Sequence, residues 1–168
     1  HKKGIVPLLE GWLCSPLGNN TDYELQIAGP DDGELSKIEP LIAKCANVKY
    51  LGAVYNEQKD NLLRQSHIYI LPSYSEGFPS SVLEAMDYGL FPLISEGCNF
   101  PEAFENKLVL EVKPNATQIA ETLSTLSEWS VNTIIAKGAA PRAFVAGNYT
   151  NEIVSNQLFD TLSQLIKL

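Results

Sequence analysis

The sequence of 168 residues has few arginines, and its apolar runs are short. Arg64 and Arg142 are the only arginines, and the net charge is −8. A nucleic-acid binder needs a basic face to neutralise phosphates, so we expect no nucleic-acid partner. A small anionic ligand is compatible with this charge, because a few local donors are enough to hold it. No apolar run approaches the roughly 20 residues that span a bilayer, so no transmembrane helix is expected.

Cysteine is also scarce, and its spacing is uninformative. Cys14, Cys45 and Cys98 are odd in number, lie far apart and form no CxxC pair. We therefore expect neither a disulfide framework nor a zinc site, and a reducing compartment fits. The first residues, with Glu10 soon after His1, lack the pattern of a secretory signal. A cytoplasmic protein is predicted.

Helical and strand-like segments alternate along most of the chain. Strands are predicted over residues 23–28, 48–51, 68–71, 91–94 and 108–112. Helices are predicted over residues 6–17, 34–46, 56–65, 80–88, 116–129, 131–146 and 151–168. Strands that alternate with helices are typical of βαβ units. The expected fold class is therefore α/β, with a doubly wound parallel sheet and a helical C-terminal third, and residues 1–168 are expected to form one domain.

Three details of this pattern lead to specific expectations. Residues 68–71 are apolar throughout, which predicts a strand buried on both faces. Pro40 is predicted to kink the helix over residues 34–46 or to delay its start. The chain opens on a loop that leads into a helix, whereas doubly wound domains usually begin with a strand. We therefore expect the first strand to lie outside this sequence.

The loop over residues 73–81 is the richest candidate for a ligand site. It follows the apolar strand and enters a helix, and ligands of doubly wound sheets bind at such loops. Unpaired N–H groups at a helix start bind anions. Here they are expected on Ser80, Ser81 and Val82. Glu76 and Glu84 flank this helix start, and their carboxylates suit sugar hydroxyls on both sides of a phosphate group. The pattern therefore favours a nucleotide-sugar as ligand.

The stretch from Leu71 to Met86 resembles the E-x7-E signature of glycosyltransferase family four, with Glu76 and Glu84 as its glutamates. Further segments resemble that family in the same order: Lys3-Gly4, Ile27–Gly33, Asn47–Val54 and Ile94–Glu102. Members of the family have the GT-B fold and transfer sugars from nucleotide-sugar donors with retention of configuration. The resemblance implies that the chain is the Rossmann-like, donor-binding C-terminal domain of a larger enzyme, whose N-terminal acceptor domain is absent here.

The resemblance also implies roles for single residues. Glu76 would be the catalytic residue that contacts the donor sugar, Glu84 would hold the ribose hydroxyls, and Lys3 would neutralise the diphosphate. The remaining donor-binding positions are implied to act mainly through their backbone: Gly29, Val54, Gly77, Phe78, Ser80 and Ser81. The family needs no metal or other cofactor, and the sequence contains no Asp-x-Asp motif.

The same resemblance sets expectations for the intact enzyme. It would transfer a hexose to a glycan or lipid-linked acceptor, at the inner face of a membrane where the acceptor is a lipid. The present chain alone would be inactive. The chain departs from the family in lacking the arginine that precedes Lys3 and in having Pro79 where glycine is common. If the last helix crosses to the missing domain, its apolar face is exposed here and favours dimerisation. This face comprises Ile153, Leu158, Leu162 and Leu165.

Simpler interpretations stay open from the sequence alone. Ser81 and Glu84 fit a capping box, in which Glu84 only caps its own helix. Glu76 and Lys3 fit solvated surface charges, Gly29 fits a turn, and Phe78 fits a core anchor. For the whole protein, a nucleotide-sugar epimerase on the same fold and a non-catalytic binding domain are the alternatives.

Overall fold

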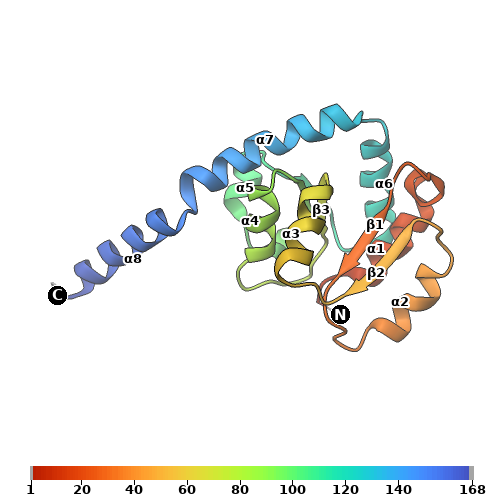
Figure 1. Cartoon of the computed structure of the whole chain (residues 1–168), viewed down its shortest axis with the longest axis horizontal. Coiled ribbons are helices and arrows are strands. Elements are labelled where there is room, and N and C mark those ends of the chain that lie inside the picture. The colour runs from red at the N-terminus through yellow and green to blue at the C-terminus, as the bar shows by residue number, and fades with distance from the viewer. Residues whose placement is uncertain (1, 167–168) are drawn as a thin grey trace.

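The computed structural model describes residues 2–166, and the side chains of all of these except residues 157, 165 and 166 (Figure 1). Its strands are β1 (Leu25–Ala28), β2 (Val48–Gly52), β3 (Ile68–Leu71), β4 (Phe91–Ile94) and β5 (Leu110–Glu111). Its α-helices are α1 (Ile5–Cys14), α2 (Leu35–Ile42), α3 (Asn56–Gln65), α4 (Ser80–Asp87), α5 (Pro101–Glu105), α6 (Ala116–Ser127), α7 (Val131–Asn148) and α8 (Asn151–Ile166). Single turns of 3-10 helix are η1 (Pro16–Asn19) and η2 (Glu96–Cys98).

Every strand pair in the described part of the chain is parallel. β1 pairs with β2, with Leu25 opposite Val48. β3, β4 and β5 form a second ladder in that order, with Ile68 opposite Phe91. The predicted α/β class with parallel strands is therefore confirmed. The strands form two ladders rather than one continuous sheet, because β1 and β3 are not paired with each other.

Two apolar clusters hold the helices and strands together. The larger one joins α1 and α6 to the strands, and Leu9, Leu93 and Ile119 are fully buried within it. The second packs α4 and α5 against β3 and β4, with Val82 and Met86 at its centre. β4 is buried at all of its residues, because helices cover both of its faces and strands flank both of its edges.

The prediction that residues 68–71 form a strand is confirmed, but the prediction that this strand is fully buried is wrong. Ile68, Tyr69 and Ile70 are only half-buried, and Leu71 alone is buried. One edge of β3 pairs with β4, while the other borders a cavity. The unpaired edge of β3, and not the type of its residues, explains why three of them are partly exposed.

The start of α2 differs from the expectation for Pro40. The helix begins at Leu35, so Pro40 does not delay it. Asp31 fixes this start, because its Oδ1 accepts hydrogen bonds from the backbone N–H groups of Gly33, Glu34 and Leu35. These bonds lower the pKa of the Asp31 carboxyl. Pro40 is accommodated within the helix, which ends soon after it, at Ile42.

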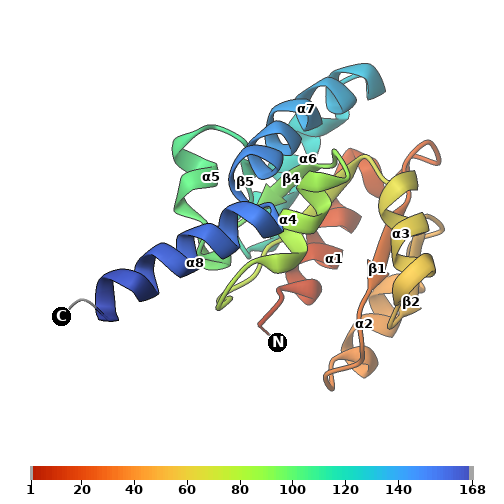
Figure 2. The ribbon, with the colours of Figure 1, turned by 60° about the vertical axis from the view of Figure 1, so that its left-hand side comes forward.

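The C-terminal third is helical, as predicted, but its last two helices have different surroundings. α7 packs against α4 and β4. α8 projects away from the rest of the molecule in both views (Figures 1 and 2). Leu158 and Leu162 are exposed as expected, Ile153 is half-buried, and the side chain of Leu165 lies outside the described residues. Between residues 2 and 166, no helix has the length and hydropathy needed to cross a membrane.

Candidate functional site

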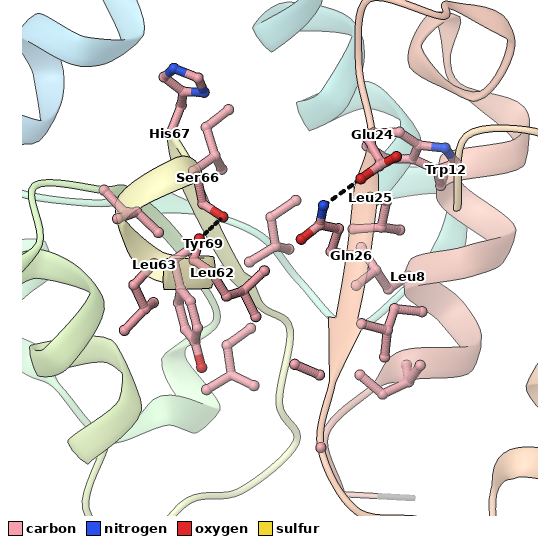
Figure 3. Close-up of a pocket in the computed structure, with 18 of the residues that line it drawn as sticks. Leu8, Trp12, Glu24, Leu25, Gln26, Leu62, Leu63, Ser66, His67 and Tyr69 are labelled. Atoms are coloured by element: carbon pink, nitrogen blue, oxygen red, sulfur yellow. Dashed lines mark hydrogen bonds between the residues drawn. The ribbon is translucent and has the colours of Figure 1, made fainter. Parts of the chain in front are cut away.

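A cavity of about 1050 Å³ lies between β1 and β3 and extends to the loops at their carboxyl ends (Figure 3). Five of the predicted site residues line it, and they come from separate parts of the sequence: Lys3, Gly29, Val54, Ser81 and Glu84. The other four do not line it: Glu76, Gly77 and Phe78 belong to the loop that links β3 to α4, and Ser80 is the first residue of α4. The fold thus gathers most of the predicted residues at one edge of the sheet.

Lys3 and Glu76 form an ion pair across this edge. The Lys3 ammonium lies 2.8 Å from both carboxylate oxygens of Glu76. Gly4 allows the N-terminal segment to lie this close to the loop after β3. Its φ is +68°, and a Cβ atom at this position would lie 2.1 Å from the carbonyl oxygen of Pro72. Only glycine combines this backbone conformation with this contact.

Glu76 has further hydrogen-bond partners besides Lys3. Its Oε1 lies 2.7 Å from Ser73 Oγ, and its backbone N–H donates to the carbonyl of Gly97 at 2.8 Å. Only 13% of its side chain is exposed. Burial acts to raise the pKa of the Glu76 carboxyl, but the hydrogen bonds from Lys3 and Ser73 outweigh it and hold this pKa below its usual value. Glu76 is therefore an anchored carboxylate and not a freely solvated one.

Glu84 has a partner on a different helix. The ammonium of Lys59, from α3, lies 2.6 Å from Glu84 Oε1. Ser81 Oγ accepts a hydrogen bond from the hydroxyl of Tyr69 at 2.9 Å. The capping-box interpretation of Ser81 and Glu84 is wrong, because no side-chain hydrogen bond caps the start of α4. Burial raises the pKa of Tyr69 to about 12, so its hydroxyl stays protonated and donates.

The backbone at the start of α4 differs from the expectation of three outward N–H groups. The N–H of Ser80 donates to the carbonyl of Phe78, and that of Val82 donates to the carbonyl of Pro79. The first contact closes a tight turn around Pro79, whose φ is −83° and ψ is 54°, and the second closes the first turn of the helix. The N–H of Ser81 remains without a backbone partner among residues 2–166. The amide site for an anion is therefore smaller than predicted in this conformation.

Phe78, Gly29 and Val54 lie in the surface loops around the cavity. Phe78 is 65% exposed, so the interpretation of Phe78 as a core anchor is wrong. The backbone of Gly29 is fixed on both sides, since its N–H donates to Gly52 and its carbonyl accepts from the Tyr50 hydroxyl. Val54 follows β2 and faces the cavity. The loops after β1, β2 and β3 thus meet at one edge, as parallel strands require.

Sequence reasoning missed Lys59 and Ser73. Ser73 is fully buried two residues after the end of β3, and a polar residue so close to the end of an apolar strand was a usable signal. Lys59 carried no local signal, because its partner Glu84 belongs to another helix. Among the described residues, no group of three or more His, Cys, Asp and Glu side chains is placed to hold a metal ion.

Residues 1–133 match the model of the family described as glycosyl transferases group 1. The chain belongs to this family. A curated relative from Campylobacter jejuni is 36% identical over an alignment 135 residues long, which covers 73% of this chain and 34% of the relative. Its name is N,N'-diacetylbacillosaminyl-diphospho-undecaprenol alpha-1,3-N-acetylgalactosaminyltransferase. The predicted membership of a glycosyltransferase family is therefore confirmed.

Solved structures of glycosyltransferases have the same fold as this group 1 domain. A glycosyltransferase from Rickettsia africae superposes with a TM-score of 0.83 at 19% identity, over 99% of this chain and 45% of that one. A protein from Anabaena in complex with UDP and glucose superposes with a TM-score of 0.75 at 17% identity, over 97% of this chain and 45% of that one. The chain spans about a fifth to a third of the curated relatives it matches first.

Proposed function

We propose that this chain is the donor-binding domain of a retaining glycosyltransferase, which transfers a hexose from a nucleoside-diphosphate sugar to a glycan or lipid-linked acceptor. The observation that carries the proposal is the meeting of Lys3, Val54 and Glu84 on one cavity, beside the anchored carboxylate of Glu76. These groups match the parts of a nucleotide-sugar, which are a diphosphate, a base, a ribose and a sugar. The neighbour in complex with UDP and glucose supports this assignment.

Each part of the donor has a group of suitable chemistry. Glu84 accepts hydrogen bonds from the ribose hydroxyls, and its second oxygen is left for them when Lys59 holds the first. Val54 contacts the base. The diphosphate lies at the start of α4, where the helix dipole and the N–H of Ser81 favour negative charge.

Donor binding requires the pair between Lys3 and Glu76 to open. Lys3 then turns to the diphosphate, and the released carboxylate of Glu76 accepts hydrogen bonds from the transferred sugar. Both groups are already held within reach, so little reorganisation is needed when charge grows on the leaving diphosphate. The loop backbone at Gly29, Gly77, Phe78 and Ser80 completes the wall around the donor.

The acceptor hydroxyl would be bound by an N-terminal domain outside this chain. We propose that α8, which projects away from the body, contacts that domain in the intact enzyme. Curated relatives named for lipid-linked substrates support a lipid-linked acceptor. We propose that this acceptor is met at the inner face of a membrane, with the present domain in the cytoplasm. The isolated chain is then expected to bind nucleoside diphosphates weakly and to transfer no sugar. The comparisons give no support to the epimerase alternative.

A thermal-shift panel with UDP, GDP and ADP tests the proposal. A nucleotide at ten times its Kd stabilises the fold by about 1.4 kcal/mol, which raises Tm by about 3 to 5 °C. We expect one of the three nucleotides to give this shift and Glu84→Ala to abolish it. Glu10→Ala is the matched control, since Glu10 is exposed on α1 away from the cavity. A shift that survives Glu84→Ala, or no shift at all, would contradict the proposed site.

The proposal also predicts that binding needs no divalent metal, because Lys3 and the start of α4 carry the diphosphate charge. The shift with the preferred nucleotide should be the same in EDTA and in magnesium chloride. Loss of the shift in EDTA would show that a metal ion supplies the charge that we assign to Lys3.

A further inference from the structure

The hydroxyls of Tyr69 and Ser81 form a hydrogen-bonded pair at the start of α4. Tyr69 belongs to β3, and Ser81 is the second residue of α4. Both residues line the same cavity as Lys3 and Glu84. The hydroxyl of Tyr69 donates to Ser81 Oγ at 2.9 Å. A strand residue thus makes a polar contact with the helix start to which we assign the diphosphate.

The ring of Tyr69 is held in place by apolar packing. It lies against two apolar clusters, of which one contains Val82 of α4 and the other contains Leu63 of α3 and Ala85 of α4. Figure 3 shows the ring beside Leu63 on the wall of the cavity. A side chain that is locked by packing holds its polar tip at a fixed position. The Tyr69 hydroxyl is therefore a stationary donor for Ser81.

The direction of this hydrogen bond leaves Ser81 with a hydrogen of its own to donate. Burial, assisted by the carboxylates of Glu76 and Glu84, raises the pKa of Tyr69 to about 12, so the phenol stays protonated at neutral pH. A serine hydroxyl that accepts one hydrogen bond keeps its own O–H. Among residues 2–166, the O–H of Ser81 has no acceptor, since Ser81 Oγ makes no other hydrogen bond.

The backbone around Ser81 offers few donors to an anion. The N–H groups of Ser80 and Val82 already donate to the carbonyls of Phe78 and Pro79. A phosphate group has several acceptor oxygens, and the O–H of Ser81 supplies a donor in addition to the N–H of the same residue. A hydroxyl that accepts one hydrogen bond while it donates another is a stronger donor, because the two bonds polarise each other.

We propose that the side chain of Ser81 donates a hydrogen bond to the diphosphate of the nucleotide-sugar, and that Tyr69 is the positioning residue that orients and polarises this hydroxyl. Tyr69 donates to Ser81 Oγ, and Ser81 donates to a phosphate oxygen, with each proton remaining on its own oxygen. The inference rests on the proposed function, since it adds a contact within the same site. It makes donor affinity depend on a tyrosine hydroxyl that does not itself contact the donor.

The competing explanation is that Ser81 only satisfies the hydroxyl of Tyr69. Such a contact would stabilise the fold, because an unpaired buried hydroxyl is costly, but it would leave nucleotide affinity unchanged. The two explanations also differ in how substitutions combine. If Tyr69 acts through Ser81, the loss of both hydroxyls weakens binding no more than the loss of the Ser81 hydroxyl alone.

A double-mutant cycle in the 168-residue chain tests the proposal. The variants are Ser81→Ala, Tyr69→Phe and the combination of both, and Tm confirms that each is folded. NMR titration of the backbone amides measures the Kd of whichever of UDP, GDP and ADP the wild-type chain binds. Tyr88→Phe is the matched control. The hydroxyl of Tyr88 also donates to a side chain, that of Asp60 at 2.8 Å, but Tyr88 does not line the donor cavity.

We expect Ser81→Ala to weaken binding about tenfold and Tyr69→Phe about threefold, as for a hydrogen bond to a charged group and for the contact that supports it. The double variant should bind as Ser81→Ala does, and Tyr88→Phe should bind as the wild type does.

An unchanged Kd in either Ser81→Ala or Tyr69→Phe would overturn the proposal. A double variant about thirtyfold weaker than the wild type would do the same, because additive losses mean that Tyr69 acts independently of Ser81. Equal losses in Tyr69→Phe and Tyr88→Phe would show a general loosening of α4 instead. A wild-type chain that binds none of the three nucleotides would contradict the proposed function, and this inference would fall with it.

Discussion

At the residue scale, the site is electrically balanced before any ligand binds. Each of its glutamates is paired with a lysine, Glu76 with Lys3 and Glu84 with Lys59. The two pairs differ in burial, because Glu76 is almost enclosed while Glu84 is about one-third exposed. The exposed pair of Lys59 and Glu84 contributes little to stability, so its importance lies in orienting the carboxylate of Glu84.

We predict that Glu76→Gln lowers the free energy of unfolding by roughly 1 kcal/mol at pH 7, through loss of the charged hydrogen bonds to Lys3 and Ser73. The folded-state pKa of Glu76 is lowered, so this stability is fully present above the ordinary glutamate pKa of about 4.3 and is lost as the pH falls through the lower folded-state value. Urea unfolding of the wild-type protein and of Glu76→Gln, at pH 7 and below pH 4, measures this difference in the free energy of unfolding. A difference that does not shrink in acid would refute the assignment.

A second prediction concerns Lys59. Lys59→Met should weaken binding of the preferred nucleotide by about threefold, because Glu84 then loses the partner that fixes its carboxylate. Titration calorimetry measures the change in Kd. Lys44→Met is the control, since Lys44 is exposed near the end of α2 and does not line the cavity. Equal effects of the two substitutions would show that only net charge matters.

At the scale of the elements, α7 lies unusually close to the turn after α4. Gly138 makes this contact possible, since a Cβ atom there would lie 1.9 Å from the carbonyl oxygen of Gly89. The turn itself needs Gly89, whose φ is +84°. β4 and α4 both pack on α7, so this crossing fixes the position of α4 and with it Glu84.

Gly138→Ala should therefore destabilise the protein by about 2 kcal/mol or more, because the methyl group meets backbone that has no room to move. Gly147→Ala is the matched control in the same helix, where a Cβ atom has nothing within 4 Å. It should stabilise the protein by up to about 1 kcal/mol through helix propensity. Thermal unfolding of both variants measures the contrast, and equal Tm values would disprove the close packing.

At the scale of the whole molecule, α8 leaves the body and carries an exposed apolar stripe. Val154, Leu158 and Leu162 lie on one face, and Phe159, which is 70% exposed, lies beside them. Exposed apolar stripes of this kind mark contact surfaces. In an intact enzyme the proposed N-terminal domain would cover the apolar stripe of α8. In the isolated chain, the α8 of another copy is the available partner.

We therefore predict that the isolated chain dimerises through α8. Sedimentation should give a mass that rises with concentration toward twice that of one chain. Leu158→Glu combined with Phe159→Glu should restore the monomer, because it places charge in the apolar contact. Asn156→Glu, on the opposite face of α8, is the control. A monomer mass at all concentrations would show that the stripe has no affinity for itself.

Local sequence signals predicted most elements correctly. The apolar run over residues 68–71 gave β3, and the helix predicted over residues 80–88 is α4. α5 was missed, since its five residues after Phe100 are too few to show a periodic pattern. The loops that carry the predicted site residues do converge, and the roles of these residues stay predictions. The alternatives that Glu84 caps its own helix and that Phe78 is a core anchor were wrong, because both depend on tertiary neighbours.

The sequence by itself determined the α/β class, the parallel strands and the membership of the glycosyltransferase family. These depend on local propensities and on the order of residues along the chain. Only the tertiary structure decided that Lys59 pairs with Glu84, that Lys3 pairs with Glu76 and that β1 and β3 face each other across a gap. Each of these contacts joins segments distant in sequence, and they become neighbours only when the helices pack and bring the strand ends together.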